Sequence, residues 1–222
     1  MKTLSRARGQ IVQGLVIGAL LLVASAPAYA TADGDGRPPA CSQAHPDDKC
    51  SYGNGRQTPG GGEKVSHHGW PQITGLFWQV AGSSGRTFVG AELNDELLGH
   101  HGSDTITGNA GKDVIWGDWD PKNNNTWQQD VVSAGDGNDW VYSSHGQNTI
   151  DAGAGDDLVW AYYGRGSIDC GAGFDTVRIR LGSANRYKHR NCERIKNFCA
   201  FGSKPGNKGG CYKPGEKPRR RG

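Results

Sequence analysis

Residues 134–178 read AGDGNDWVY SSHGQNTID AGAGDDLVW AYYGRGSID CGAGFDTVR, which are five consecutive rows of nine. Three further rows, GAELNDELL, GHHGSDTIT and GNAGKDVIW, occupy residues 90–116. The eighth position of every row is Leu, Ile or Val, while the fourth is mostly Gly and the sixth mostly Asp. A fixed period of this length indicates a repeat architecture in which each row packs on its neighbours.

The 17 residues between these two blocks, 117–133, end in QDVVS and place Val132 in the eighth position. We interpret them as one row carrying an eight-residue insertion. Reading them as nearly two rows would direct Asn124 inward, and a buried amide without a partner is costly. The phase of all later rows depends on this choice.

Each column of the repeat has a predicted place. Successive strand side chains face opposite sides, so the aliphatic eighth residue points inward and its two neighbours point outward. The glycine-rich remainder forms the turn. Its backbone carbonyls and the sixth-position carboxylate supply only oxygen ligands, which hard cations such as Ca²⁺ require.

The nonapeptide resembles the RTX, or hemolysin-type, calcium-binding repeat over residues 90–178. The resemblance implies an all-β fold, a right-handed parallel β-roll (β-solenoid) with two nonapeptide rows per coil and strands on two faces. It further implies Ca²⁺ as the cofactor, held between successive turns on the same side. It does not imply toxin activity.

Two rows per coil place alternate rows on opposite edges of the roll. The first edge then carries the unbroken aspartate column of Asp95, Asp113, Asp139, Asp157 and Asp175. The second edge carries Asp104, Asp130, Asn148 and Gly166, so its carboxylates disappear toward the C-terminus. We predict that the calcium ligands are Asp95, Asp104, Asp113, Asp139, Asp157 and Asp175.

Aromatic residues recur beside the inward column, with Trp116, Tyr142 and Trp160 at position nine and Trp140 at position seven. They predict an apolar outer face that is either a ligand face for a sugar or protein partner, or a patch covered by residues 75–80. We prefer the covered patch, because large exposed apolar patches are uncommon on monomers.

The flanking segments differ in composition from the repeat. Residues 1–30 carry three basic residues, an apolar run and Ala28-Tyr29-Ala30, which predict a secretory signal peptide and an extracellular mature protein without a transmembrane segment. Residues 31–64 read as a disordered Gly/Pro-rich linker, and 65–89 as a lead-in or cap. Residues 179–202 are a predicted C-terminal cap, and 203–222 a basic flexible tail.

The sequence contains six cysteines and no C-x-x-C pair. In an exported chain this favours disulfides over a zinc site, although six cysteines allow 15 pairings. Pairing nearest neighbours gives Cys41–Cys50, Cys170–Cys192 and Cys199–Cys211, and the second of these staples the cap to the last repeat.

The charge is segregated along the chain. Residues 90–178 hold 15 acidic and four basic residues, whereas residues 179–222 hold two acidic and 13 basic ones. Calcium would relieve the repulsion within the acidic part. The basic end is either a solvated tail or an attachment site for an extracellular glycan or anionic cell-surface polymer. Its lack of interleaved aromatics argues against nucleic acid, and the G-x-G fragments belong to the repeat and do not indicate a nucleotide site.

Catalytic motifs such as H-E-x-x-H and G-x-S-x-G are absent from the sequence. Asp151 and Asp169 occupy position nine in successive coils and could form a carboxylate pair suited to glycoside hydrolysis, but two solvated acids are the simpler interpretation. Adjacent histidines such as His100 and His101 are predicted surface residues.

The sequence predicts a secreted, non-enzymatic calcium-binding module with a structural or surface-binding role, whose folding depends on Ca²⁺. The alternatives are a carbohydrate-binding adhesin and a polysaccharide-active β-helical enzyme.

Overall fold

The computed structural model describes residues 41, 44–52, 69–120, 127–181 and 186–199, and the backbone of 204–205 and 211–212. The predicted signal peptide lies outside the described residues, as do most of the predicted linker and tail. No helix that could cross a membrane occurs in the described part of the chain. Its regular elements are all β-strands.

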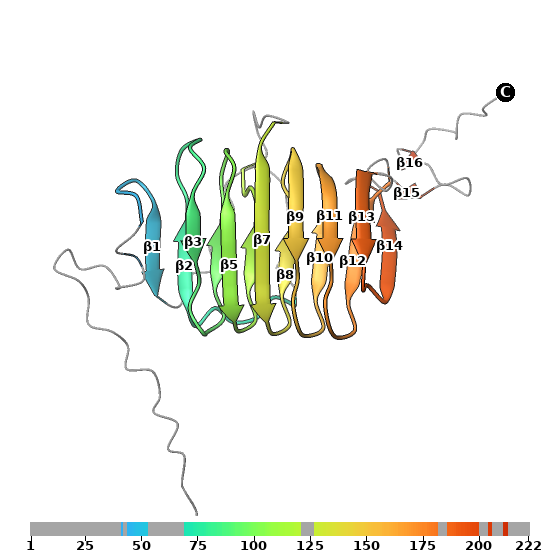
Figure 1. Ribbon diagram of the computed structural model, residues 1–222, viewed down its shortest axis with the longest axis horizontal. Helices are drawn as coiled ribbons and strands as arrows, with labels where there is room; N and C mark the ends of the chain where they lie inside the picture. The colour runs from blue at the N-terminus through green and yellow to red at the C-terminus, as the bar shows by residue number, and fades with distance from the viewer. Residues whose placement is uncertain are drawn as a thin grey trace, which may run out of the picture. The chain divides into compact units, whose positions relative to one another are not determined.

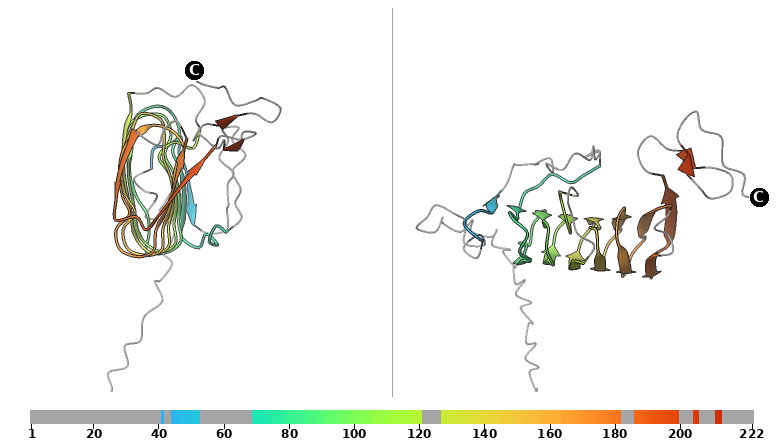
Figure 2. Two further views of the ribbon diagram at one scale, coloured as in Figure 1. Left: turned by 90° about the vertical axis from the view of Figure 1, so that its right-hand side faces the viewer. Right: turned by 90° about the horizontal axis from the view of Figure 1, so that it is seen from above.

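Two sheets of parallel strands face each other and form a β-solenoid of about six turns (Figures 1 and 2). The first sheet runs in the order β1 (Lys49–Tyr52), β2 (Leu76–Gln79), β4 (Glu96–Leu98), β6 (Val114–Trp116), β8 (Trp140–Tyr142), β10 (Leu158–Ala161), β12 (Thr176–Arg180), β14 (Arg194–Phe198). The second sheet contains β3 (Thr87–Val89), β5 (Thr105–Ala110), β7 (Gln129–Asp136), β9 (Gln147–Asp151), β11 (Arg165–Asp169) and β13 (Tyr187–Arg190). The pairing of β1 with β2 is antiparallel, as is that of β15 (Lys204–Pro205) with β16 (Cys211–Tyr212).

The register of the strands confirms two rows per coil. Val159 lies beside Val141 and Ile168 beside Ile150, which are one coil apart in the sequence. Across the insertion, Ile115 lies beside Val141, and the corresponding hydrogen bond from Asp113 to Asp139 spans 26 residues instead of 18. Residues 117–133 therefore form a single row with an eight-residue insertion, as the sequence predicts.

The core is a stack of inward side chains, with one or two from most of the strands. In the second sheet the alternation is plain, because β9 has an exposed-buried pattern that turns Asn148 and Ile150 inward and Thr149 outward. The eighth-position aliphatics are at most 2% exposed. They form the main hydrophobic cluster, which contains Leu97, Ile106, Ile115, Val132, Val141, Ile150, Val159, Ile168 and Val177.

The roll extends beyond both of its predicted limits at 90 and 178. The predicted lead-in supplies β2 and β3, whose inward residues Trp78 and Phe88 pack with ring centroids 5.3 Å apart. The predicted cap supplies β13 and β14, which continue the two sheets in parallel. Periodicity in Gly and Asp missed both coils because their rows lack Gly at the fourth position and Asp at the sixth.

The predicted linker is also wrong for residues 49–52, which form β1. Asp48 fixes this strand, because its carboxylate accepts hydrogen bonds from Trp78 Nε1 at 3.2 Å and from the Ala81 N–H at 2.9 Å. The Cys41–Cys50 disulfide closes the adjoining loop. This segment contains few aliphatic residues, yet it forms a strand because the buried Asp48 carboxylate and the Cys41–Cys50 disulfide hold it in place.

Two predicted disulfides are present, Cys41–Cys50 and Cys170–Cys192. The second joins the last glycine-rich row to the additional coil that follows it. Cys199 is disulfide-bonded, whereas the side chain of its predicted partner, Cys211, lies outside the described residues.

The turns of the first edge require glycine at the fourth position. Gly155 has φ +141°, and a Cβ atom there would lie 1.8 Å from the carbonyl oxygen of Gly137 in the preceding coil. Side chains at this position are therefore excluded twice, by the backbone conformation and by the close approach of stacked turns.

We expect Gly155→Ala to lower the free energy of unfolding of the calcium-loaded protein by about 1–3 kcal/mol, because the added methyl group forces successive turns apart. Ala172→Ser, at an exposed position in the next turn, is the control and should leave stability unchanged. Thermal or denaturant unfolding measures both. Equal stability of the two variants would contradict the proposed packing of the turns.

Candidate metal centre

The aspartates of the first edge form a continuous ladder along the roll. In each step, one carboxylate oxygen accepts a hydrogen bond from the backbone N–H of the preceding aspartate in the column. The Asp95, Asp113, Asp139 and Asp157 N–H groups donate at 2.8 Å to the Oδ1 atoms of Asp113, Asp139, Asp157 and Asp175 respectively. The ladder places one buried carboxylate in every coil at the start of its strand.

The second carboxylate oxygen of four ladder residues is buried without a hydrogen bond to any described residue. These atoms are Oδ2 of Asp113, Asp139, Asp157 and Asp175. A buried carboxylate oxygen without a partner is costly unless a cation or proton neutralises it. The residues present therefore fit a hard cation that takes oxygen ligands.

Backbone oxygens face the same spaces. A Cβ atom at Gly108 would lie 2.5 Å from Asp113 Oδ2 and 2.2 Å from the Ala134 carbonyl oxygen, so this glycine leaves both oxygens beside one small gap. Within the described ranges, no group of three or more His, Cys, Asp or Glu side chains is arranged to hold a metal. Each ion would accordingly draw many of its ligands from backbone carbonyls, with one or two carboxylates at most, and Ca²⁺ accepts such a mixture.

Two of the predicted ligands differ from the other four. Both oxygens of Asp95 accept backbone hydrogen bonds, from Leu76 and Ala91. Asp104 on the second edge does the same with Arg86 at 2.8 Å and His100 at 3.0 Å. These carboxylates already have protein donors, which makes them weaker candidates for calcium than the four with an unpaired oxygen.

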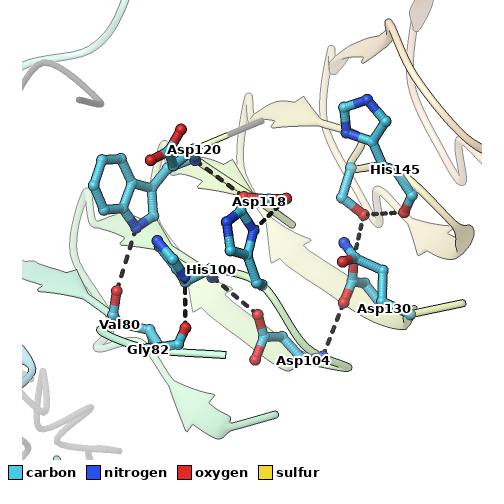
Figure 3. A network of polar contacts seen from close by, with 12 residues as sticks. Val80, Gly82, His100, Asp104, Asp118, Asp120, Asp130 and His145 are labelled. Atoms are coloured by element: carbon cyan, nitrogen blue, oxygen red, sulfur yellow. Dashed lines mark hydrogen bonds and ion pairs between the residues drawn. The ribbon is translucent and has the colours of Figure 1, made fainter. Parts of the chain in front are cut away.

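On the second edge, the carboxylates accept hydrogen bonds from polar side chains and the backbone, which leaves them less free to bind a metal (Figure 3). Asp130 accepts the Asp104 N–H at 2.9 Å through Oδ1, while its Oδ2 accepts Ser144 Oγ and the Gln128 amide. His100 Nδ1 lies 2.5 Å from the Gly82 carbonyl, and His101 Nδ1 lies 3.4 Å from Asp118. The two histidines, predicted as surface residues, are thus partly buried members of a network.

Gly166 has a specific role at the C-terminal end of this edge. Tyr187 on β13 and Asn148 on β9 flank it, two coils apart, yet Asn148 Nδ2 donates to the Tyr187 hydroxyl at 2.9 Å. Because Gly166 lacks a side chain, the tyrosine reaches across its coil. The tyrosine hydroxyl also donates to the Tyr163 carbonyl at 2.6 Å. At this end of the second edge, a cluster of hydrogen-bonded neutral groups therefore takes the place of the aspartates.

The predicted aromatic column exists, and part of it is covered. Trp116 and Tyr142 stack with centroids 4.1 Å apart, and Tyr142 stacks on Trp160 at 6.2 Å. Trp70 covers them and donates to the Tyr142 hydroxyl at 2.9 Å, which leaves Trp116 and Tyr142 6% and 5% exposed.

The covering segment differs from the predicted one. Residues 76–79 of the expected cover form strand β2 of the same sheet, whereas Trp70 and Ile73 pack on the outer face. Only Trp140 and Trp160 of the predicted ligand face remain partly exposed.

Burial raises the pKa of each of the five aspartates of the ladder. The values are about 7 for Asp95, about 9 for Asp113, about 6 for Asp139 and about 8 for Asp157, and the pKa of Asp175 is also raised. Neighbouring aspartates add to this in the middle of the column, because Asp95 and Asp139 both raise the pKa of Asp113. Without a metal, the ladder therefore holds protons near neutral pH.

The comparison with family models matches the RTX calcium-binding nonapeptide repeat, in four copies, over residues 89–120 and 126–159. The chain contains RTX calcium-binding repeats. The gap between the two matched ranges falls in the insertion. No curated protein and no solved structure matches this chain. RTX repeats bind calcium, which agrees with the unpaired ladder oxygens.

Two acidic residues that belong to these edges escaped the sequence analysis. Glu193 continues the ladder, because its Oε2 accepts the Asp175 N–H at 2.8 Å. Asp118, 4% exposed and with a pKa raised by burial to about 8, lies at the start of the insertion beside His101. An 18-residue offset from Asp175 would have found Glu193, whereas no signal in the sequence marks Asp118.

We expect Asp157→Asn to weaken calcium binding at least tenfold, because it removes the charge of an unpaired ladder oxygen while keeping its shape. Asp151→Asn removes the same charge from an exposed position on the outer face and is the matched control. Asn148→Ala tests the second edge and should also spare calcium affinity. Titration calorimetry gives the three affinities, and equal losses in all of them would contradict the assignment to the first edge.

The raised pKa values also predict opposite pH dependences with and without metal. The folded, metal-free chain binds more protons than the unfolded chain, since burial raises the pKa of the ladder aspartates above the usual aspartate value of 3.8. Its stability should therefore fall as pH rises from about 4 toward about 9. With excess Ca²⁺ the trend should reverse, because the ion binds ionised carboxylates.

Thermal melts followed by circular dichroism at about pH 5 and about pH 8, in chelator and in excess calcium, measure this reversal. A protein that is as stably folded in chelator at about pH 8 as at about pH 5 would show that the ladder carboxyls are not buried as described.

Proposed function

We propose that this protein is exported and acts as a calcium-binding β-roll module without enzymatic activity, and that its folding depends on Ca²⁺. The observation that carries the proposal is the row of four buried ladder oxygens without a hydrogen-bond partner among the described residues. Each of them needs a positive charge in the folded state, and unfolding returns them to water.

Export is supported by the sequence of residues 1–30 and by the disulfides. The basic start, the apolar run and the small residues near position 30 are those of a secretory signal peptide. Disulfides such as Cys170–Cys192 persist in oxidising compartments. Extracellular calcium is abundant enough to load sites of modest affinity.

A glycosidase role is disfavoured by the surroundings of the candidate carboxylates. Asp151 and Asp169 lie side by side in register on the outer face. Burial raises the pKa of Asp169, but hydrogen bonds from Arg190 and Asn191 outweigh this effect, so the net pKa is lowered and the group is unsuited to act as a general acid. The Asp169 carboxylate is paired with Arg190 and Asp151 is exposed, so the pair lacks a buried acid beside a nucleophile.

A carbohydrate-binding role for the aromatic face has less support than the sequence suggested. Trp116 and Tyr142 are covered by Trp70, and the guanidinium of Arg178 lies 4.4 Å above the ring centroid of Trp160. These rings pack against other side chains instead of presenting a flat face for a sugar ring. The column therefore supports a structural role, and any surface binding has to use another part of the molecule.

We expect the mature protein in chelator at about pH 8 to be largely disordered and to gain β-structure cooperatively with Ca²⁺ at roughly 10⁻⁴–10⁻³ M, the range of extracellular modules. Far-UV circular dichroism during a calcium titration measures the transition. Mg²⁺ at equal concentration is the control and should be less effective, because it demands a tighter octahedral shell. An identical spectrum in chelator and in calcium would refute calcium-dependent folding.

A further inference from the structure

A second polar site lies at the end of the second edge where the aspartates are missing. A cavity of about 280 Å³ opens there beside the turns that precede β9 and β11 and the ends of β12 and β13. None of the described residues that line it is acidic. Its lining consists of His145, Gly146, Tyr163, Gly164, Arg165, Arg180 and Arg186.

Three guanidinium groups converge on this cavity without counterions among the described residues. Arg165 begins β11, Arg180 ends β12 and Arg186 immediately precedes β13. None of the ion pairs between described residues includes them, whereas Arg190 on the neighbouring surface pairs with Asp169. Arginine clusters of this kind suit oxyanions, since each guanidinium can donate two parallel hydrogen bonds to one anionic group.

The fold explains why the positive charge collects here. Farther toward the N-terminus, the second edge carries Asp104 and Asp130, but at this end Asn148 and Gly166 replace them and Tyr187 fills the space. The inward column is therefore uncharged under the cavity. The field of the three arginines is not cancelled from below, as it would be on the aspartate-bearing coils.

The walls of the cavity are held in place by ring contacts. Arg180 lies over the rings of Tyr162 and Tyr163, at 5.3 and 5.7 Å from their centroids. His145 stacks on Tyr163 with centroids 4.0 Å apart. Burial, with the nearby His101 and Arg180, lowers the pKa of His145, so its imidazole is neutral at pH 7 and can donate or accept a hydrogen bond.

These stacked rings decide between classes of ligand. Proteins that bind single-stranded nucleic acid offer free aromatic faces on which bases stack. Here the Tyr163 ring already packs against His145 and Arg180, so the site offers hydrogen-bond donors in a small enclosed space. A cavity just below the usual size of a small-molecule pocket suits a single acidic unit.

We propose that this cavity is an anion-binding site that holds the carboxylate, sulfate or phosphate group of one acidic sugar unit through Arg165, Arg180 and Arg186. The inference goes beyond the proposed calcium-binding function by giving the molecule a second site with its own ligand chemistry. The two edges of the roll then differ in function: the first binds cations, and the C-terminal end of the second binds anions.

The test uses the mature, calcium-loaded protein and titration calorimetry with glucuronate, glucose 6-phosphate and sodium sulfate, with glucose as the neutral control. We expect at least one anionic probe to bind and glucose not to bind. Tighter binding of a sugar acid than of sulfate identifies a saccharide as the source of the anion, and equal binding identifies a site for the oxyanion alone.

Two variants and one control locate the site. Arg186→Gln changes an exposed side chain, and Arg180→Gln changes one that packs on the tyrosines. Both should weaken binding at least tenfold, whereas Lys196→Gln, which removes the same charge from the exposed surface of β14, should change it less than twofold. An Arg180→Gln protein that fails to fold leaves the test to Arg186→Gln.

The proposal is overturned if no anionic probe binds to protein that circular dichroism shows to be folded in calcium. It is also overturned if Lys196→Gln weakens binding as much as Arg186→Gln, or if only a single-stranded oligonucleotide binds. Failure of the proposed calcium-dependent folding appears separately, as a spectrum that calcium does not change.

Discussion

Buried carboxylates that lack a positive partner are the constraint on which this structure depends. The ladder hydrogen bonds satisfy one oxygen of each aspartate through the backbone of the neighbouring coil. The other oxygen of Asp113, Asp139, Asp157 and Asp175 stays unpaired in a desolvated position. Such a column repels itself and holds protons at neutral pH, so a divalent cation both removes the repulsion and replaces the protons.

The remaining features of the roll follow from this requirement. Turns must stack closely enough for carboxylates and carbonyls to share an ion, and glycines such as Gly155, which cannot carry a side chain there, permit the approach. The thin hydrophobic core contains one or two inward side chains from most of the strands. Further contacts stabilise the outer face and the C-terminal end of the roll. Trp70 packs on part of the aromatic column. The Cys170–Cys192 disulfide joins the last glycine-rich row to the coil that follows it.

The two edges use different solutions to the same problem. On the first edge four carboxylate oxygens lack a hydrogen bond to any described residue and can bind a cation. On the second edge Ser144, Gln128 and backbone N–H groups donate hydrogen bonds to the carboxylates of Asp104 and Asp130. Beyond Asp130 the carboxylates disappear, and Asn148 and Tyr187 complete a neutral polar cluster. This change of chemistry along one edge leaves Arg165, Arg180 and Arg186 without an ion-pair partner among the described residues, and the anion site that we propose rests on these three side chains.

The sequence by itself determined the period, the inward column, the aspartate ladder and the eight-residue insertion, because each depends only on the spacing of residues along the chain. The prediction that neighbouring cysteines pair agrees with the two observed disulfides, although the sequence alone left 15 pairings open. Tertiary structure alone decided which carboxylates retain an unpaired oxygen, since Asp95 and Asp113 look alike in their rows but only Asp95 receives two backbone donors. It decided as well that Trp70 covers Tyr142. That contact joins a repeat row to a segment whose local sequence carries no repeat signal, and only the folding of the chain brings the two together.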